Sequence, residues 1–208
     1  MKQYGFQEFK VRLSERFEKE EVDYNEWCKN DILTDEERKA QRERIWEYPP
    51  LISVVVPIYK TPEVFLRQMI ESVTAQTYPH WQLCIADGSG DTAETKRIVD
   101  SYLSDRLSEN ALYEVADRIC KTGAEIVYTD EDKVTSDLSE RYQPNFKPDF
   151  NLDLLRSNNY ICHLLVVKKT LVQEVGGQKK EFDGAQDHEF LFRCVEKAKG
   201  IEHITKVL

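Results

Sequence analysis

The chain has 208 residues, of which 40% are hydrophobic and 11% aromatic, and its formal net charge is −9. This composition suits one globular domain with an appendage and excludes a disordered chain. The acidic charge argues against nucleic-acid binding, and the longest apolar run, residues 51–56, is too short to span a bilayer. The N-terminus lacks a signal-peptide core, and five cysteines without CxxC spacing predict reduced, mostly buried thiols in a cytoplasmic protein without a zinc site.

Residues 1–48 differ from the rest because 23 of them are charged. Thr34 and Glu37 have the spacing of a capping box, which indicates a helix start. We expect two or three charged helices here, packed on or beside the main domain, since dense mixed charge is typical of a solvated helix face. A partner-binding arm is the alternative. Two prolines end this extension, and the main domain is predicted to cover residues 49–208.

The main domain opens with a βαβ pattern. Residues 51–57 are β-branched and almost entirely apolar, which is typical of a strand buried on both faces of a parallel sheet. Thr61 and Pro62 predict a helix start, and residues 81–86 are the second buried strand. The apolar face of the helix between them comprises Phe65, Leu66, Met69, Ile70 and Val73. Such a unit is expected to have a right-handed crossover.

The rest of the chain continues to alternate between helices and strands. One helix is predicted at Ile98, Val99 and Tyr102, and another at Leu112, Val115, Ala116 and Ile119. Further strands are predicted at residues 124–128, 163–167 and 204–208. The fold class is therefore α/β, with a mostly parallel central sheet flanked by helices. Residues 146–160 are rich in Pro, Asp and Asn and are interpreted as an active-site loop.

Carboxylates follow several of these strands. Ligands of open α/β sheets bind beyond the carboxyl ends of the strands, where Asp87 follows the second strand and Asp130 and Asp132 follow the third. Asp187 lies in the first turn of an amphipathic helix, where free N–H groups favour negative charge. Taken alone, Asp187 is more often a residue that stabilises the helix start, but a carboxylate there can also accept a proton from a substrate hydroxyl.

One competing motif is a dinucleotide-binding pattern. Residues 88–93 match GxGxxA after a strand and before a helix. However, Asp87 and Asp91 would place carboxylates beside a pyrophosphate, and no second strand with a ribose-binding acid follows at the usual distance. An NAD-binding oxidoreductase is therefore disfavoured. P-loop, HExxH and GxSxG motifs are absent, and the four scattered histidines are expected to be structural or exposed.

Seven short motifs carry a resemblance to a known family. They are LISVVVPIY (51–59), QTYP (76–79), ADGS (86–89), YTDEDK (128–133), FKPD (146–149), VGG (175–177) and GAQD (184–187). Together they resemble the family 2 inverting glycosyltransferases, which have the GT-A fold, a Rossmann-like α/β architecture. The most similar branch is that of bacterial cell-surface polysaccharide assembly, of the rhamnan or O-antigen type. The resemblance covers residues 49–208, and the charged extension also resembles that branch.

The resemblance implies roles for particular residues. Pro57, Ile58 and Tyr59 would line the nucleotide base, largely through backbone groups, and Asp87 would accept a hydrogen bond from the imide N–H of uracil or thymine. Asp187 would be the general base that deprotonates the acceptor hydroxyl for attack on the anomeric carbon, with inversion. The donor would be a UDP- or dTDP-type nucleotide-sugar. The acceptor would be a glycan or lipid-linked glycan in the cytoplasm, at the inner face of the membrane if the protein associates peripherally.

The resemblance also implies a divalent cation, Mn²⁺ or Mg²⁺, that would hold the diphosphate. Its ligands are not identified in this sequence. Asp130 and Asp132 form a DxD pattern, but in the family this position is downstream of the metal motif, so a donor-sugar or supporting role is expected, with metal binding as the alternative.

The chain departs from the family in one stretch. In the family, a strand, a helix and a strand ending in the metal-binding acidic motif precede the helix that here follows Ser108. Here Arg106 runs directly into Leu107, so a few dozen residues are missing, through either an omitted segment or a deletion. The chain also ends at Leu208, before the family's further metal-ligand histidine, which suggests a truncated C-terminus. A non-catalytic or degenerate sugar-nucleotide-binding domain is therefore the alternative function.

Overall fold

The computed structural model describes residues 23–58, 61–87 and 106–208. Helices and strands alternate, as predicted. In chain order they are α2 (Tyr24–Asn30), α3 (Asp35–Glu43), β1 (Ile52–Ile58), α4 (Glu63–Thr74), β2 (Trp81–Asp87), α6 (Ala111–Thr122), β3 (Ile126–Val134), β4 (Arg141–Asn145), α7 (Leu152–Ser157), β5 (Leu165–Val167), α8 (Lys169–Val175), the 3₁₀ helix η1 (Lys180–Phe182), α9 (Gln186–Lys197) and β6 (Ile201–Val207). No helix within these ranges has the length and apolarity that crossing a membrane requires. The helix predicted at Ile98, Val99 and Tyr102 lies outside the described residues.

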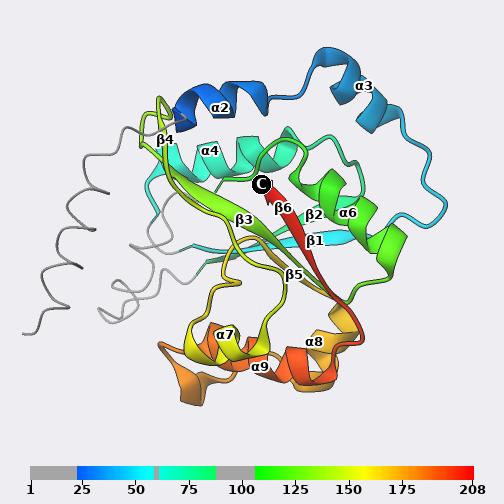
Figure 1. Cartoon of the computed structure of the whole chain (residues 1–208), viewed down its shortest axis with the longest axis vertical. Helices are drawn as coiled ribbons and strands as arrows, with labels where there is room; N and C mark the ends of the chain where they lie inside the picture. Colours follow the sequence, from blue (N-terminus) through cyan, green and yellow to red (C-terminus); the bar gives the residue numbers. More distant parts are fainter. Residues whose placement is uncertain (1–22, 59–60, 88–105) are drawn as a thin grey trace, which may run out of the picture.

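The strands of the described ranges form two sheets. β1 and β2 pair in parallel, as the βαβ pattern predicted. The second sheet is built around β3, which pairs in parallel with β6 and antiparallel with β4 and β5. Figure 1 shows β3 and β6 side by side through the centre of the molecule, with α7, α8 and α9 grouped at one end and α2 and α3 at the other.

Strand β1 is buried on one face only. Ile52 is buried, whereas Val55 is 69% exposed, and the whole strand alternates in this way. The prediction of a strand buried on both faces is therefore wrong. Ile52 and Val54 pack into a core formed with α6, β3 and β6, whereas no element of the described ranges buries Val55 on the opposite face.

The apolar residues predicted to form one face of α6 are buried in the core beneath the sheets. Leu112, Val115 and Ala116 are almost completely buried there, against Val127 of β3. Tyr78, which is fully buried, donates a hydrogen bond from its hydroxyl to the carbonyl oxygen of Pro50 at 2.6 Å. Burial raises the pKa of Tyr78 to about 12. This contact holds the chain segment that enters β1 against the core.

The described part of the charged extension packs on the main domain. Thr34 Oγ1 accepts a hydrogen bond from the Glu37 amide at 3.2 Å, and the Glu37 carboxylate accepts one from the Thr34 amide at 2.8 Å, so the predicted capping box is present. Arg38 donates two hydrogen bonds, at 2.7 and 2.6 Å, to the carboxylate of Glu109 at the start of α6. The domain boundary between residues 48 and 49 stays a prediction.

Four of the described elements were not predicted, namely α7, β4, α8 and η1. The segment interpreted as a loop contains helix α7, whose Asn151 side chain accepts a hydrogen bond from the Leu154 amide and whose Leu155 is fully buried. β4 forms an antiparallel hairpin with β3. The expectation of mostly buried thiols is also only partly met: all five cysteines are free, but Cys28 and Cys194 alone are buried.

Candidate functional site

The parallel pairing of β1 and β2 brings the predicted nucleotide-binding residues to one edge. Ile58 lies opposite Asp87 and Pro57 opposite Ala86 in the strand register. Pro57 is exposed and Ile58 is half-buried at the end of β1. Tyr59 lies outside the described residues, and of Asp87 only the backbone is described. The backbone thus places Ile58 and Asp87 on adjacent strands, as a shared base-binding role requires.

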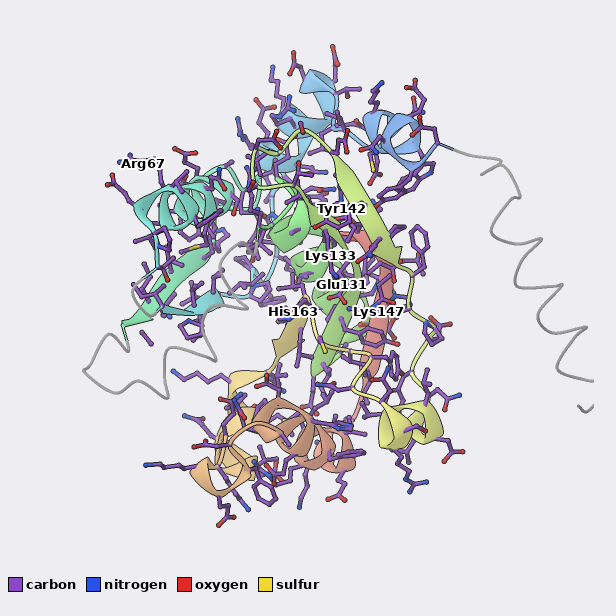
Figure 2. The ribbon with its side chains drawn as sticks, turned by 90° about the vertical axis from the view of Figure 1, so that its left-hand side faces the viewer. Arg67, Glu131, Lys133, Tyr142, Lys147 and His163 are labelled. Carbon is purple, nitrogen blue, oxygen red and sulfur yellow. The ribbon has the colours of Figure 1, made fainter. Side chains whose placement is uncertain are left out.

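A groove of about 1060 Å³ begins at this edge. One wall comprises residues 54–58 of β1 together with the apolar face of α4. The other comprises the β3–β4 hairpin, including Glu131, and residues 162–165, which lead into β5. Figure 2 shows Glu131, Lys133 and Tyr142 following one another along the hairpin, with Lys147 and His163 beside Glu131. The groove therefore has an apolar wall and a polar, charged wall.

Asp130 is a buried structural carboxylate. Its side chain is 5% exposed, and its Oδ1 accepts hydrogen bonds from the Lys147 amide at 2.8 Å and from His203 Nε2 at 2.9 Å. The His203 ring stacks on Tyr128 with ring centroids 4.7 Å apart, and its Nδ1 lies 3.3 Å from Asp149. Asp130 thus joins β3, β6 and the start of the 146–160 segment. The side chain is not among those that line the groove.

Asp132 is held by two partners. Arg141 of β4 donates to its Oδ2 at 2.5 Å, and the hydroxyl of Tyr24 in α2 donates to the same oxygen at 2.7 Å. The side chain of Asp132 is 10% exposed. Burial, followed by these interactions with Asp132, raises the pKa of Tyr24, so its hydroxyl remains protonated at neutral pH. Asp132 therefore ties the charged extension to the hairpin.

Lys147 is a fully buried lysine at the groove. Its side chain is 0% exposed, donates to the carbonyl oxygen of His163, and lies 3.4 Å from Glu131. Burial lowers the pKa of this lysine, while the charge of Glu131 acts in the opposite direction. Lys147 thereby joins the polar wall of the groove to the segment before β5.

Asp187 lies in the first turn of α9, as predicted. Its side chain is exposed, and Gln178 Nε2 donates to its Oδ1 at 2.5 Å. Asp187 does not line the groove, but its charge acts on Cys162, which does. Partial burial raises the pKa of the Cys162 thiol, and the charges of Glu131 and Asp187 raise it further. Cys162 lines the groove, so the charges of Glu131 and Asp187 both affect the pKa of a thiol in the groove wall.

The turn that carries Gln178 is fixed by Arg193 of α9. Gly176 and Gly177 have φ values of 81° and 68°, a left-handed conformation that favours glycine. Arg193 donates to the carbonyl oxygens of Val175 and Gly177, the latter at 2.7 Å. The same guanidinium makes two hydrogen bonds of 2.6 Å to Glu189. The VGG motif is thus held against α9, and Gln178 is brought to Asp187.

The described carboxylates do not suit a divalent cation. No group of three or more His, Cys, Asp or Glu side chains in the described ranges could hold a metal ion. Asp130 is already bonded to His203 and the Lys147 amide, and Asp132 to Arg141 and Tyr24. The alternative of a metal site at Asp130 and Asp132 is therefore not supported, and the cation implied by the resemblance stays a prediction.

Several residues of this region were not found from the sequence. His203 was expected to be structural, without a partner being named, and Lys147, Gln178 and Arg193 were not singled out. Arg193 had one usable signal, because Glu189 precedes it by four residues on the same helix. The partners of Lys147, Glu131 and His163, each lie 16 residues away and on other elements, so no helix or strand periodicity could have indicated them.

Comparisons with known proteins agree on one family. A family model described as "Glycosyl transferase family 2" matches residues 53–110. Among curated proteins, the chain is 38% identical to the uncharacterized protein y4gI of Sinorhizobium fredii, over 76% of this chain and 22% of that protein. It is 31% identical to the O-antigen biosynthesis protein RfbC of Myxococcus xanthus, over 90% of this chain and 18% of that protein. The chain thus spans about a fifth of these relatives.

The lengths of these matches reveal additional residues in the relatives. The match to y4gI runs over 200 residues but takes in 76% of this chain, which is about 158 of its 208 residues. The match to RfbC runs over 230 residues and takes in 90%, which is about 187 residues. Each relative therefore has about 40 residues within the matched region that have no counterpart here, and the missing stretch at residues 106 and 107 stays a prediction.

Solved structures share the fold. The structure of Staphylococcus aureus TarS residues 1–349 superimposes with a TM-score of 0.56 over 76% of this chain and 59% of that one, at 16% sequence identity. The complex of the same protein with UDP gives a TM-score of 0.55. At this identity the likeness concerns the fold, and it confirms the predicted α/β architecture.

Proposed function

Starting from the resemblance to family 2 glycosyltransferases, which the family model and the relatives confirm, we propose that this chain is the nucleotide-sugar domain of a glycosyltransferase. The domain would transfer a sugar, with inversion, from a UDP- or dTDP-type donor to a growing surface polysaccharide or lipid-linked glycan. The observation that carries this proposal is the register of β1 and β2, which aligns Ile58 with Asp87 at the mouth of the groove.

The nucleotide base would lie over the end of β1. Pro57 and Ile58 line the groove there, and Asp87 follows in the neighbouring strand. A carboxylate at this position would accept the imide N–H of uracil or thymine, which guanine and adenine do not offer in the same place. Tyr59 would complete the base site. The UDP-bound structure of the similarly folded TarS supports this choice of nucleotide.

Asp187 would accept the proton of the acceptor hydroxyl. The acceptor oxygen would attack the anomeric carbon, forming the new glycosidic bond while the bond to the nucleoside diphosphate breaks on the opposite face. The proton would pass to the Asp187 carboxylate, which Gln178 orients. A general base of this kind contributes roughly 10²–10⁴-fold to the rate. The name of RfbC, an O-antigen biosynthesis protein, supports a surface glycan as the acceptor. We place this reaction in the cytoplasm, at the inner face of the membrane if the protein associates with it.

A second function, a non-catalytic sugar-nucleotide-binding domain, is favoured by one specific observation. The relatives have about 40 additional residues within the matched region, whereas here the chain runs directly from Arg106 to Leu107. In the resemblance, the missing stretch carries the acidic motif that holds the diphosphate. Such a domain would bind the nucleotide through β1 and β2 and would transfer no sugar.

Calorimetric titration with UDP, dTDP, ADP and GDP tests the shared part of both functions. We expect UDP or dTDP to bind at least about fivefold more tightly than the purine nucleotides, since leaving a polar group without its hydrogen-bond partner costs at least about 1 kcal/mol. Asp87→Ala should remove the preference. Asp137→Ala, in the exposed turn between β3 and β4, is the control. Equal affinity for all four nucleotides would exclude both functions.

Transfer of sugar from a panel of UDP- and dTDP-sugars to a lipid-linked glycan acceptor, with Mn²⁺ present, separates the two functions. Transfer by the wild-type chain that Asp187→Asn abolishes supports the enzyme. Nucleotide binding without any transfer supports the binding domain. Unchanged transfer by Asp187→Asn contradicts the assignment of the base.

A further inference from the structure

One face of the β3–β4 hairpin gathers polar side chains in the groove. Glu131 lies opposite Asn145 in the strand register, and Lys133 lies opposite Tyr142. Residues opposite each other in an antiparallel pair point to the same face, as do residues two apart in one strand. The four residues therefore share a face, and all of them line the groove. Figure 2 shows Glu131, Lys133 and Tyr142 along this wall.

An extra residue in β4 produces this arrangement. Glu131 and Lys133 are two residues apart on β3, whereas their partners on β4 are three apart. Residues three apart in a regular strand point to opposite faces, so the bulge brings both Tyr142 and Asn145 to the groove. Gln143, inside the bulge, has a φ of 50°, a left-handed conformation that is uncommon for residues other than glycine. Bulges are frequent beside active sites, where they redirect side chains.

The carboxylate of Glu131 is fixed from two sides. Asn145 Nδ2 donates a hydrogen bond to its Oε1 at 3.0 Å, and Nζ of the fully buried Lys147 lies 3.4 Å from its Oε2. The side chain of Glu131 is 28% exposed. A carboxylate has about four acceptor positions, so it can accept further hydrogen bonds beside these two. A carboxylate that is already ordered is well suited to bind hydroxyl groups, because little entropy is lost on binding.

The same face adds an aromatic ring and a cation. Tyr142 is 44% exposed in the groove wall. Lys133 is exposed and donates one hydrogen bond to Gln143 at 2.8 Å, and an ammonium carries three donors. Binding sites for small molecules combine apolar or aromatic surface with a few fixed polar groups. A sugar ring has this chemistry in reverse, with a C–H face that packs on an aromatic ring and a rim of hydroxyls.

We propose that this hairpin face is the subsite for the terminal sugar of the acceptor glycan, and that Glu131 selects a sugar with two adjacent hydroxyls. The C–H face of the sugar packs on Tyr142. The inference rests on the proposed function, because in an inverting reaction the acceptor approaches the anomeric carbon from the face opposite the nucleotide. The nucleotide is proposed to lie at β1, and the hairpin belongs to the other wall of the same groove.

The proposed base acts on this wall as well. The charges of Glu131 and Asp187 both raise the pKa of the Cys162 thiol, which lines the groove. An acceptor sugar bound to Glu131 is therefore on the side of the groove where its reacting hydroxyl meets the carboxylate of Asp187. Glu131 itself is a specificity-determining residue and takes no proton in this reaction.

Titration of the isotopically labelled full chain with simple glycosides, followed by NMR, tests the subsite without any sugar transfer. The probes are the methyl glycosides of glucose, galactose, mannose, rhamnose and N-acetylglucosamine. We expect at least one of them to shift the side-chain amide signals of Asn145 and Gln143 with saturation, also in the presence of UDP. Its deoxy analogue, which lacks one of two adjacent hydroxyls, should bind at least about fivefold more weakly. Absence of a saturable shift with every glycoside overturns the inference.

Substitutions then locate the binding. Glu131→Gln and Tyr142→Ala should each weaken the glycoside at least about fivefold, whereas Tyr142→Phe, which keeps the ring, should retain its affinity. Glu140→Gln is the matched control, because Glu140 is an exposed carboxylate of the same hairpin that does not line the groove. If Glu131→Gln fails to fold because Lys147 loses its partner, Tyr142→Ala still decides. Unchanged affinity in Tyr142→Ala overturns the inference.

The transfer assay distinguishes the acceptor from the donor. Tyr142→Ala should raise KM for the lipid-linked acceptor at least about fivefold and leave KM for the nucleotide-sugar unchanged. A higher KM for the nucleotide-sugar alone would place the donor sugar on the hairpin and overturn the inference. Where the chain transfers no sugar, the glycoside titration alone decides. Failure of the proposed function is recognised separately, by equal affinity for all four nucleotides, a readout on which the glycoside titration does not depend.

Discussion

The side-chain nitrogen Nε2 of Gln178 lies 2.5 Å from Oδ1 of Asp187. Gln178 directly follows the VGG turn, which Arg193 of α9 holds by hydrogen bonds to its carbonyl oxygens. If Asp187 is the base, Gln178 is a positioning residue that holds the carboxylate in one orientation. The turn and the helix start then act as one unit.

Replacing Gln178 with Leu should lower the turnover number for transfer about tenfold, because the carboxylate of Asp187 is no longer held in one orientation. Affinity for UDP should not change, since Gln178 does not line the groove. Single-turnover transfer and calorimetric titration measure the two quantities. Lys179→Ala, which removes an exposed neighbour, is the control, and an unchanged turnover number for Gln178→Leu would refute the positioning role.

Replacing Arg193 with Ala should destabilise the chain by about 2 kcal/mol, because charged hydrogen bonds to Glu189 and to two carbonyl oxygens are lost. Urea unfolding measures the loss. Hydrogen exchange should become faster in residues 175–178, which the guanidinium holds. Lys197→Ala removes a largely exposed ion pair with Glu174 on the same helix and should cost about 0.5 kcal/mol or less. An equal loss of unfolding free energy in the two variants would contradict the role of Arg193 in holding the turn.

Asp130→Ala should destabilise the chain by about 2–4 kcal/mol and leave the UDP affinity of the folded fraction unchanged. The substitution leaves the amide of Lys147 and the ring of His203 without their buried partner. Urea unfolding and calorimetric titration give the two quantities. A loss of affinity for the nucleotide-sugar, with stability intact, would instead favour the donor-sugar role implied by the family resemblance.

The buried Lys147 should make stability depend on alkaline pH. Burial lowers its folded-state pKa below the usual lysine value near 10.4. Between the two pKa values the unfolded chain binds more protons than the folded chain, so the free energy of unfolding rises with pH through this window. Below the window, the lysine charge opposes folding by a constant amount.

Lys147→Met should remove this rise. Unfolding measured between pH 8 and roughly 10.5 should give a smaller slope for the variant than for the wild-type chain. Lys133→Met is the matched control, because Lys133 is an exposed lysine in β3, whose ammonium donates a hydrogen bond to Gln143. Identical slopes for Lys147→Met and the wild type would show that the lysine does not titrate differently in the folded state.

Local sequence patterns predicted the elements that are determined by residues close together in the chain. The apolar periodicity of α6 and the capping box of α3 are both observed, because each depends on residues within one or two turns. α7 was missed although Asn151 and Asp153 mark its start, since six residues are too short for a periodic signal. β4 was missed because Pro144 and its polar residues resemble a loop, and its pairing depends on β3.

The site was predictable only where residues follow a strand or begin a helix. The positions of Asp187 in the first turn of a helix and of Ile58 at a strand end were predicted in this way, because strand ends and helix starts are visible in the sequence, and the roles of both residues stay predictions. The partners of Asp132 are separated from it by 108 residues in one case and 9 in the other, and those of Asp130 by 73 and 17. Such contacts depend on the assembled sheet, so whether a carboxylate is available to a ligand could not be read from its own neighbourhood.

The exposed side of β1 has a consequence for handling the protein. Within the described residues only β2 pairs with β1, so the other edge of β1, beside the exposed Val55, can pair with the same strand of another molecule. Pro57, without an amide hydrogen, interrupts such pairing only near the end of the strand. Concentrated solutions should therefore self-associate through this edge. A charged residue in place of Val55 should keep the chain dispersed.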